Sequence, residues 1–237
     1  MTCRHPPMMR HRLDRAIRVL CPLIEGQMKA RECNQWLEID LRKELVGCIV
    51  SSQVRHEMAV ATTENLEQAG LLDDSWWCDI QEQNFGTEVF RVLSGQRQDL
   101  NYLGAYRFPR ARAVQLARAR DAIAGVPLLT RLSNGYSPRM LRHNLVADIP
   151  GLGPKQASMF LRNIGKSYDL AILDTHVLRF MDMHELLSMS QTRVATVIGY
   201  ERTERVAVDY AEMIGYPVGY LDWAIWATMK AAGELGL

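Results

Sequence analysis

Apolar residues recur at every third or fourth position along most of this chain, and convincing strand-like alternation is scarce. Between residues 36 and 50 the apolar positions follow one helix face: Leu37, Leu41, Leu45, Cys48 and Ile49. The same pattern continues over residues 54–68 and stops at Gly70, a residue type that suits a helix C-terminus. Further helices are expected around Trp76 and Trp77 and at residues 88–94, 111–124, 138–147, 155–164, 174–181, 201–214 and 218–232. We therefore expect an all-α fold.

A glycine-rich turn joins two of these expected helices, at residues 149–153. Gly151 and Gly153 can adopt a positive φ without steric cost, and Pro154 suits the first position of a helix. The outward-pointing N–H groups of such a hairpin can hold a phosphate. The pattern predicts a helix–hairpin–helix that binds a nucleic-acid strand, with Lys155 beside that strand.

Lys155 has two chemical readings, a counter-charge for phosphate or a nucleophile. The chain holds 28 lysines and arginines, of which only five are lysines. Arginine is always protonated, whereas a desolvated lysine can lose its proton and form a Schiff base. At a helix N-terminus the macrodipole and burial both disfavour the ammonium form, and the same dipole keeps a carboxylate such as Asp174 ionised.

Net charge, hydropathy and cysteine content exclude few classes of function. A net charge of +1 neither requires nor excludes DNA binding, because local patches decide it. The chain has no apolar run of membrane-spanning length and no secretory signal at its start, so we expect no membrane association and a cytoplasmic, nucleoid-associated location. The five cysteines are scattered and form no C-x₂-C pair, so we expect reduced thiols and no cofactor, neither zinc nor an iron–sulfur cluster.

The hairpin and Asp174 together resemble the helix-hairpin-helix DNA glycosylase superfamily. Its hairpin reads roughly L-P-G-[VI]-G-x-K-x-A in members that are also AP lyases, and Gly151, Gly153, Lys155 and Ala157 match this pattern. The chain looks most like the compact archaeal and bacterial 8-oxoguanine DNA glycosylase/AP-lyase subfamily, through residues 44–53, 155–165, 169–176 and 221–226. The resemblance runs from about residue 40 to about residue 230.

Two departures from related enzymes matter. The chain has no cysteine after Cys78, which rules out the C-terminal four-cysteine cluster of endonuclease III-like members. It ends in Gly236 and Leu237, where members of the compact subfamily often end in a lysine that helps to hold the base. The second departure bears on which base is recognised and not on the chemistry at the sugar.

The resemblance implies a helix-hairpin-helix glycosylase fold of two helical lobes, with the active site in the cleft between them. It divides the chain into an N-terminal extension of unknown role (1–35), a terminal lobe (36–53 with 168–237) and a central lobe carrying the hairpin (54–167). Lys155 and Asp174 are the implied catalytic residues. Asp222 and Trp226, four positions apart on one helix face, would line the base pocket as acceptor and stacking platform.

A base leaves the stack to be processed, so a further side chain is expected to fill its place, and Gln53 suits this role. The other DNA-binding residues that we expect are Gly151, Gly153, Arg107, Arg110 and His176. Arg107 and Arg110 belong to a basic cluster that also includes Arg112, Arg118 and Arg120. A monovalent cation at the carbonyls of Gly151, Leu152 and Gly153 is the one metal site that the resemblance leaves open.

Each assignment has a plainer structural alternative. Asp174 can simply cap a helix, Trp226 can be a core residue beside a surface Asp222, and Gln53 can merely end a helix. The arginines can form a solvated face, and His176 can be a packed helix residue.

The favoured function is a bifunctional DNA glycosylase/AP lyase that excises 8-oxoguanine, or another modified guanine, from double-stranded DNA. Alternatives are the same chemistry on a deazaguanine-type base in a defence or modification system, and a non-catalytic DNA-binding or interaction module. The sequence does not indicate the oligomeric state.

Overall fold

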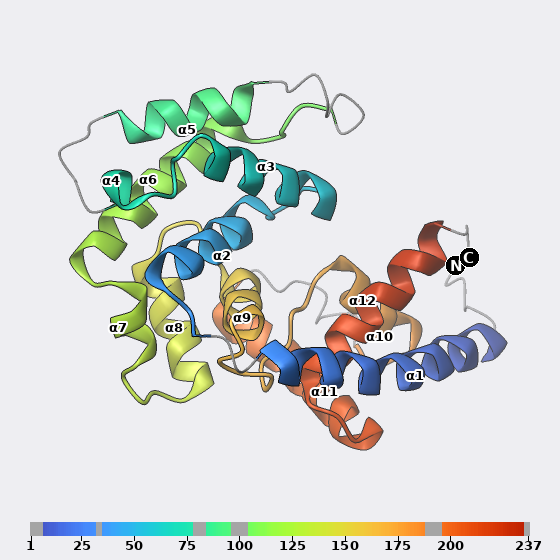
Figure 1. Ribbon diagram of the computed structural model, residues 1–237. Coiled ribbons are helices and arrows are strands. Elements are labelled where there is room, and N and C mark those ends of the chain that lie inside the picture. The colour runs from blue at the N-terminus through green and yellow to red at the C-terminus, as the bar shows by residue number, and fades with distance from the viewer. Residues whose placement is uncertain (1–6, 32–34, 78–83, 96–103, 188–195, 235–237) are drawn as a thin grey trace. The chain divides into compact units, whose positions relative to one another are not determined.

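The computed structural model describes residues 7–31, 35–77, 84–95, 104–187 and 196–234. All regular elements within these ranges are helices, which confirms the expected all-α class (Figure 1). In chain order they are α1 (Pro7–Arg31), α2 (Glu38–Val50), α3 (His56–Gln68), α4 (Asp74–Trp77), α5 (Phe85–Ser94), α6 (Pro109–Gly125), α7 (Leu128–Leu132), α8 (Pro138–Asp148), α9 (Pro154–Asn163), α10 (Thr175–Met183), α11 (Val197–Ile214) and α12 (Val218–Glu234). No helix in the described ranges is long and apolar enough to cross a membrane.

The chain divides into two compact units, residues 35–160 and residues 1–34 with 161–237. This division differs from the expected one in where it puts two segments, residues 36–53 and the N-terminal residues. Residues 36–53, expected beside the C-terminal part, belong to the unit of residues 35–160. The described part of the expected N-terminal extension is a helix of the other unit, while residues 1–6 and 32–34 lie outside the described residues.

In the unit of residues 35–160, α5 packs against α6, and α2 packs against α3 and α7. The short helix α7 was not predicted from the sequence. Its first two N–H groups, of Leu128 and Leu129, donate to the carboxylate of Glu38 in α2 at 2.8 and 3.0 Å. A helix start that is capped from a distant residue carries no local sequence signal.

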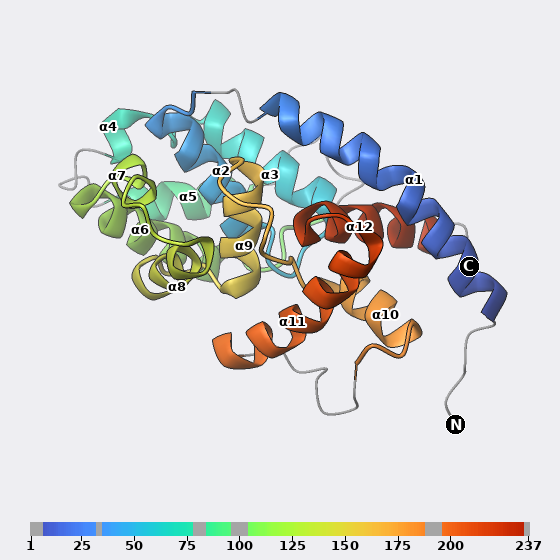
Figure 2. The ribbon, with the colours of Figure 1, turned by 90° about the horizontal axis from the view of Figure 1, so that it is seen from below.

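In the other unit, α1 and α10 both pack against α12 (Figures 1 and 2). Helix α1 buries one face of five residues, Leu13, Ile17, Cys21, Ile24 and Met28, in the core that it shares with α10, α11 and α12. Asp14 accepts hydrogen bonds from Tyr210 at 3.0 Å and pairs with His184 at 2.9 Å, which ties α1 to the other helices. The expected N-terminal extension of unknown role therefore contributes a core helix over residues 7–31.

Candidate active site

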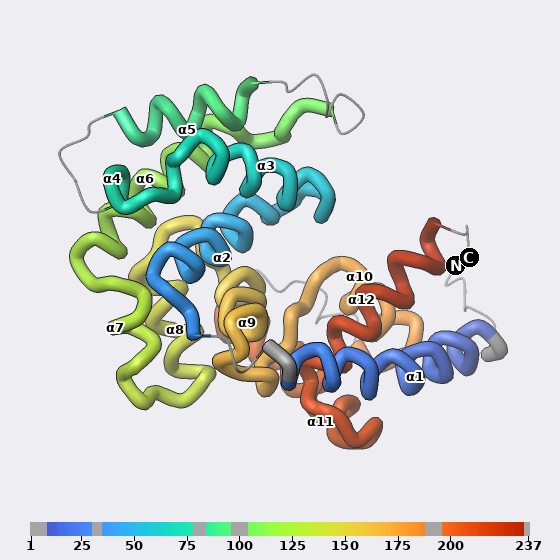
Figure 3. Tube along the Cα trace, in the orientation of Figure 1, coloured from blue at the N-terminus to red at the C-terminus, as the bar shows by residue number. Residues whose placement is uncertain are grey.

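The glycine hairpin lies between α8 and α9, as predicted (Figure 3). Ile149 and Leu152 are buried and anchor it. Gly151 has a φ of +94°, and a Cβ at this position would lie 3.1 Å from Gln115 Cβ and 3.2 Å from Ile49 Cγ2. Backbone conformation and close packing therefore both require glycine here. Gly153 has no positive φ, so the expected left-handed geometry occurs at Gly151 alone of the two.

Lys155 is the second residue of α9 and is partly buried. Its Nζ lies 3.8 Å from the sulfur of Met159, one turn further along the helix. The carbonyl of Gly153 accepts the first helical hydrogen bond, from Ala157 N at 2.9 Å. The amine thus stands at the N-terminal end of a helix beside an uncharged thioether.

Asp174 is the N-cap of α10, as the sequence predicted. Its Oδ1 accepts a hydrogen bond from Val177 N at 2.8 Å, and its side chain is partly exposed. The second oxygen, Oδ2, accepts no hydrogen bond from any described residue. The cap therefore engages only one of the two carboxylate oxygens, and the catalytic role of Asp174 stays a prediction.

Asp222 is buried within the unit of residues 1–34 and 161–237, and both oxygens of its side chain already accept hydrogen bonds. The residue is 2% exposed, its Oδ1 pairs with Arg162 Nη1 at 2.6 Å, and its Oδ2 accepts from Ile172 N at 2.7 Å. Burial raises the pKa of Asp222 to about 7, although the Arg162 guanidinium and the Ile172 N–H both lower it. Both oxygens that a base pocket would use have partners within the protein.

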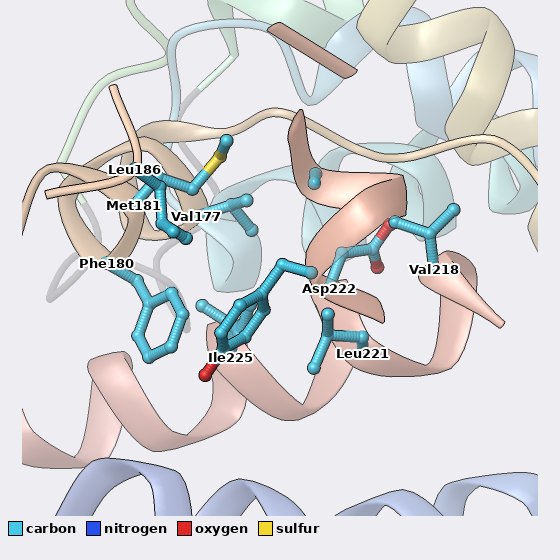
Figure 4. A pocket seen from close by; sticks show the side chains of 10 residues that line it. Val177, Phe180, Met181, Leu186, Val218, Leu221, Asp222 and Ile225 are labelled. Atoms are coloured by element: carbon cyan, nitrogen blue, oxygen red, sulfur yellow. The ribbon is translucent and has the colours of Figure 1, made fainter. Parts of the chain in front are cut away.

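Figure 4 shows Asp222 beside a small pocket whose other labelled side chains are apolar. The pocket also includes Tyr210, whose hydroxyl already donates to Asp14. A purine presents several polar atoms along its edges, and this pocket offers them no unengaged partner. The predicted base contact of Asp222 stays a prediction, and the geometry favours an internal role for this residue.

The buried carboxyl makes the stability of the protein pH-dependent in a defined direction. The folded chain keeps the Asp222 proton up to about pH 7, whereas the unfolded chain releases it near the ordinary pKa of 3.8. Between these values the folded state binds more protons, so the contribution of Asp222 to the free energy of unfolding falls as pH rises. Asp222→Asn does not titrate, so the unfolding free energy of the wild type minus that of the variant is expected to decrease over this range.

Urea unfolding followed by circular dichroism at several pH values measures this difference, and groups common to both proteins cancel. A difference that increases with pH would contradict the prediction. It would mean that Arg162 keeps the carboxylate ionised despite its burial.

Trp226 lies one turn beyond Asp222 in α12 and is partly exposed. The ammonium of Lys230 lies 5.2 Å from the centre of its ring. The four-residue spacing thus places the two predicted pocket residues one turn apart, but only Trp226 reaches the surface. A stacking role for Trp226 stays a prediction.

Gln53 is exposed, and its φ of +62° is unusual for a residue other than glycine. The turn that carries it is held by two buried residues, since Arg112 donates to Ser52 O at 3.0 Å and Tyr106 donates to Val50 O at 2.8 Å. Such strain persists only where the surroundings enforce it, and it is concentrated at functional positions. Gln53 is thus presented to solvent on a rigid turn.

The predicted cluster of five arginines does not form one surface. Arg112 and Arg120 are buried, the first against the Gln53 turn and the second beside Asp121. Arg107, Arg110 and Arg118 are exposed. The guanidinium groups of Arg107 and Arg110 lie 4.9 Å from the ring centre of Phe108 and 5.8 Å from that of Phe90, respectively. The phosphate contacts of Arg107 and Arg110 stay predictions, whereas Arg112 has a structural role.

His176 is partly buried in the first turn of α10, two residues after Asp174. Among the described residues, no three or more His, Cys, Asp or Glu side chains gather so as to hold a metal ion. Cys21 and Cys48 are buried thiols that form no disulfide, and the other three cysteines lie outside the described residues. The DNA contact of His176, the lack of a cofactor and the monovalent cation at residues 151–153 stay predictions.

Sequence reasoning missed Tyr200 and Glu204, which hydrogen-bond to the segment before Asp174, and Arg162, which pairs with Asp222. Arg162 and Asp222 are 60 positions apart in the sequence. Nothing in the local pattern of either residue marks the pair. Only the packing of the helices reveals it.

Comparison with known proteins places these features in a family. The family model described as 8-oxoguanine DNA glycosylase (Ogg-HhH) matches residues 27–216. The 8-oxoguanine DNA glycosylase/AP lyase of Korarchaeum cryptofilum is 29% identical over 211 residues, which are 86% of each chain. The enzyme of the same name from Sulfurisphaera tokodaii is 31% identical over 139 residues, 59% of this chain and 66% of that protein.

Several curated relatives are matched over only 55–66% of their own length. Among solved structures, the 8-oxoguanine DNA glycosylase of Thermotoga maritima superposes with a TM-score of 0.71 at 26% identity. That alignment covers 94% of this chain and 96% of the other. Fold, hairpin and family match agree, and the chain belongs to the Ogg-HhH family of 8-oxoguanine DNA glycosylases.

Proposed function

We propose that this protein is a DNA glycosylase and AP lyase that removes 8-oxoguanine from double-stranded DNA through a Schiff base on Lys155. The observation that carries the proposal is a lysine on the first turn of the hairpin helix α9, followed in the chain by an N-cap aspartate with one unengaged oxygen. The names of the curated relatives support this substrate and both activities.

The chemistry assigns a distinct task to each residue. The neutral amine of Lys155 attacks C1′ of the damaged nucleotide, the bond from C1′ to the base breaks, and the base leaves with the bonding electrons and a proton. The ionised carboxylate of Asp174 stabilises the positive charge that develops on the sugar, takes the proton released by the amine and passes it to the departing base. The C1′–O4′ bond then breaks, O4′ takes up a proton from water, and the nitrogen lone pair forms the iminium at C1′. Loss of a proton from C2′ then breaks the C3′–O bond and releases the 3′ phosphate.

Other residues of the chain are proposed to bind the DNA. The N–H groups of the hairpin hold a backbone phosphate. Arg107 and Arg110 neutralise further phosphates, and Trp226 stacks on the displaced base. The proposed partner is therefore double-stranded DNA with the damaged nucleotide turned out of the helix, and the proposed location is the cytoplasm, on the nucleoid.

Borohydride trapping tests the proposal directly, because it converts the Schiff base into a stable covalent adduct. The protein is incubated with three duplexes that carry 8-oxoguanine opposite cytosine, an abasic site, or undamaged guanine. Adducts on the first two duplexes alone are expected. An adduct on the abasic duplex only would keep the lyase and point to another modified base, such as a deazaguanine-type base. No adduct on any duplex would contradict catalysis and favour a binding module.

Gln53 gives a prediction that separates stability from activity. Gln53→Gly relieves the left-handed backbone, so the free energy of unfolding is expected to rise by about 0.5–1 kcal/mol. The same change removes the side chain proposed to fill the vacated position in the duplex. Single-turnover excision from the 8-oxoguanine duplex is expected to fall about tenfold, since opening the stack costs on the order of a few kcal/mol.

Two controls accompany this variant. Cleavage of the abasic duplex requires no base to leave the stack and should stay unchanged. Glu185 is the other non-glycine residue with positive φ in the described ranges (+57°), and Glu185→Gly should leave excision unaffected. Equal excision rates for Gln53→Gly and the wild type would show that Gln53 does not fill the duplex.

A further inference from the structure

The segment that leads into Asp174 is irregular and buried, and it has no neighbouring strand in the described ranges. Leu170, Ala171, Ile172 and Leu173 are each at most 5% exposed. A strand of a sheet would satisfy its backbone N–H groups through an adjacent strand. Here the partners have to come from elsewhere, because leaving a buried N–H without a hydrogen bond is strongly unfavourable.

Side chains of α11 and α12 supply partners for three consecutive N–H groups. The hydrogen bonds run from Ala171 N to Glu204 Oε1 (2.9 Å), from Ile172 N to Asp222 Oδ2 (2.7 Å) and from Leu173 N to the Tyr200 hydroxyl (3.0 Å). The Tyr200 hydroxyl also donates to the carbonyl of Ala171 at 2.7 Å. The side chains thus take the place of a neighbouring strand.

All three side chains are deeply buried: Tyr200 is 1%, Asp222 2% and Glu204 7% exposed. Asp222 is itself oriented by Arg162, which lies over the ring of Trp223 at 4.8 Å. Burying carboxyl and phenol groups is unfavourable unless each makes good hydrogen bonds. These residues therefore form a specific arrangement around one segment.

The arrangement ends at Asp174. Its N–H donates to Ile172 O at 2.9 Å, and its Oδ1 accepts from Val177 N. The carboxylate is therefore fixed from both sides, by the held segment before it and by the start of α10 after it.

We propose that Tyr200, Glu204 and Asp222 are positioning residues, which set the place of the Asp174 carboxylate by holding residues 171–173. The inference rests on the proposed function, because it assigns these residues to the chemical step of that reaction. A displacement of about 1 Å at a catalytic group can lower the rate about 100-fold. Loss of one of these contacts should therefore slow chemistry more than it weakens DNA binding.

Tyr200→Phe and Tyr210→Phe form a matched pair for the test. Both tyrosines lie on α11 in the same core, and each variant loses only a buried hydroxyl. The Tyr210 hydroxyl donates to Asp14 of α1 and does not contact the segment before Asp174. The readouts are the single-turnover excision rate at saturating protein, the dissociation constant for the 8-oxoguanine duplex, and amide hydrogen exchange over residues 170–174.

For Tyr200→Phe we expect faster amide exchange over this segment, an excision rate reduced about 10- to 100-fold, and a dissociation constant within about threefold of the wild type. Tyr210→Phe should lower the melting temperature similarly and leave exchange of the segment and the excision rate near those of the wild type. Wild-type excision by Tyr200→Phe, or equal slowing by both variants, would overturn the inference. A wild-type protein that is inactive on both damaged duplexes would instead overturn the proposed function.

Glu204 supplies a second, conservative test. Glu204→Gln keeps an oxygen that can accept the hydrogen bond from Ala171 N, whereas Glu204→Met keeps the length of the side chain without an acceptor oxygen. Glu204→Gln should retain excision within about threefold, and Glu204→Met should slow it about tenfold or more. Equal rates for the two variants would show that the hydrogen bond does not position Asp174.

Discussion

Lys155→Gln is expected to lower cleavage of the 8-oxoguanine duplex by about 10⁴-fold or more and to abolish borohydride trapping, because an amide cannot form a Schiff base. The variant should fold normally, since Lys155 lies on the first turn of α9 and is only partly buried. Binding of the duplex should weaken by no more than about tenfold, because the hairpin N–H groups remain.

Lys166→Gln is the matched control. Lys166 is exposed and follows α9 by three positions, so its loss removes the same charge without touching the proposed nucleophile. The control should keep trapping and cleavage near wild-type levels. Residual trapping by Lys155→Gln would show that another amine is the nucleophile. Equal losses of cleavage and trapping in both variants would show that Lys155 acts only as a counter-charge for phosphate.

Asp174→Asn separates the two roles of this residue. Asparagine caps helices about as well as aspartate, so the free energy of unfolding should change by only a few tenths of a kcal/mol. The carboxylate is lost, and single-turnover excision should fall by about 10²- to 10⁴-fold. Excision kinetics together with urea unfolding measure both effects on one preparation.

Thr196→Ala is the control for loss of a cap. Thr196 Oγ1 accepts a hydrogen bond from Gly199 N at 3.1 Å at the start of α11. Its loss should cost about 1 kcal/mol of stability without slowing excision. If Asp174→Asn excises 8-oxoguanine at the wild-type rate, Asp174 serves only as a helix cap.

Local features of the chain were predictable because short-range physics decides them. The helix of residues 36–50, the hairpin with Gly151 and the cap at Asp174 each depend on residues within a few positions of one another. Helix α1 carried the same kind of signal, since Leu13, Ile17, Cys21, Ile24 and Met28 recur at three- and four-residue spacing. Prolines and arginines occur in the same segment, and both residue types are more typical of a surface than of a core helix.

Other features depend on contacts between distant residues. The sequence cannot show that Glu38 caps α7, or that Arg112 turns inward to hold the turn of Gln53. Similarly, the residues around Asp222 in the sequence do not indicate that it pairs with Arg162 in the interior. In each case the same residue type would suit a surface equally well, and burial decides its role.

The sequence by itself determined the all-α class, the hairpin, and the placement of Lys155 and Asp174 at helix starts, because turns, caps and amphipathic periodicity act over a few residues. Only the tertiary structure decided which polar side chains are turned inward. It placed Tyr200, Glu204 and Asp222 around the segment before Asp174, where buried N–H groups require partners that no neighbouring residue in the sequence supplies.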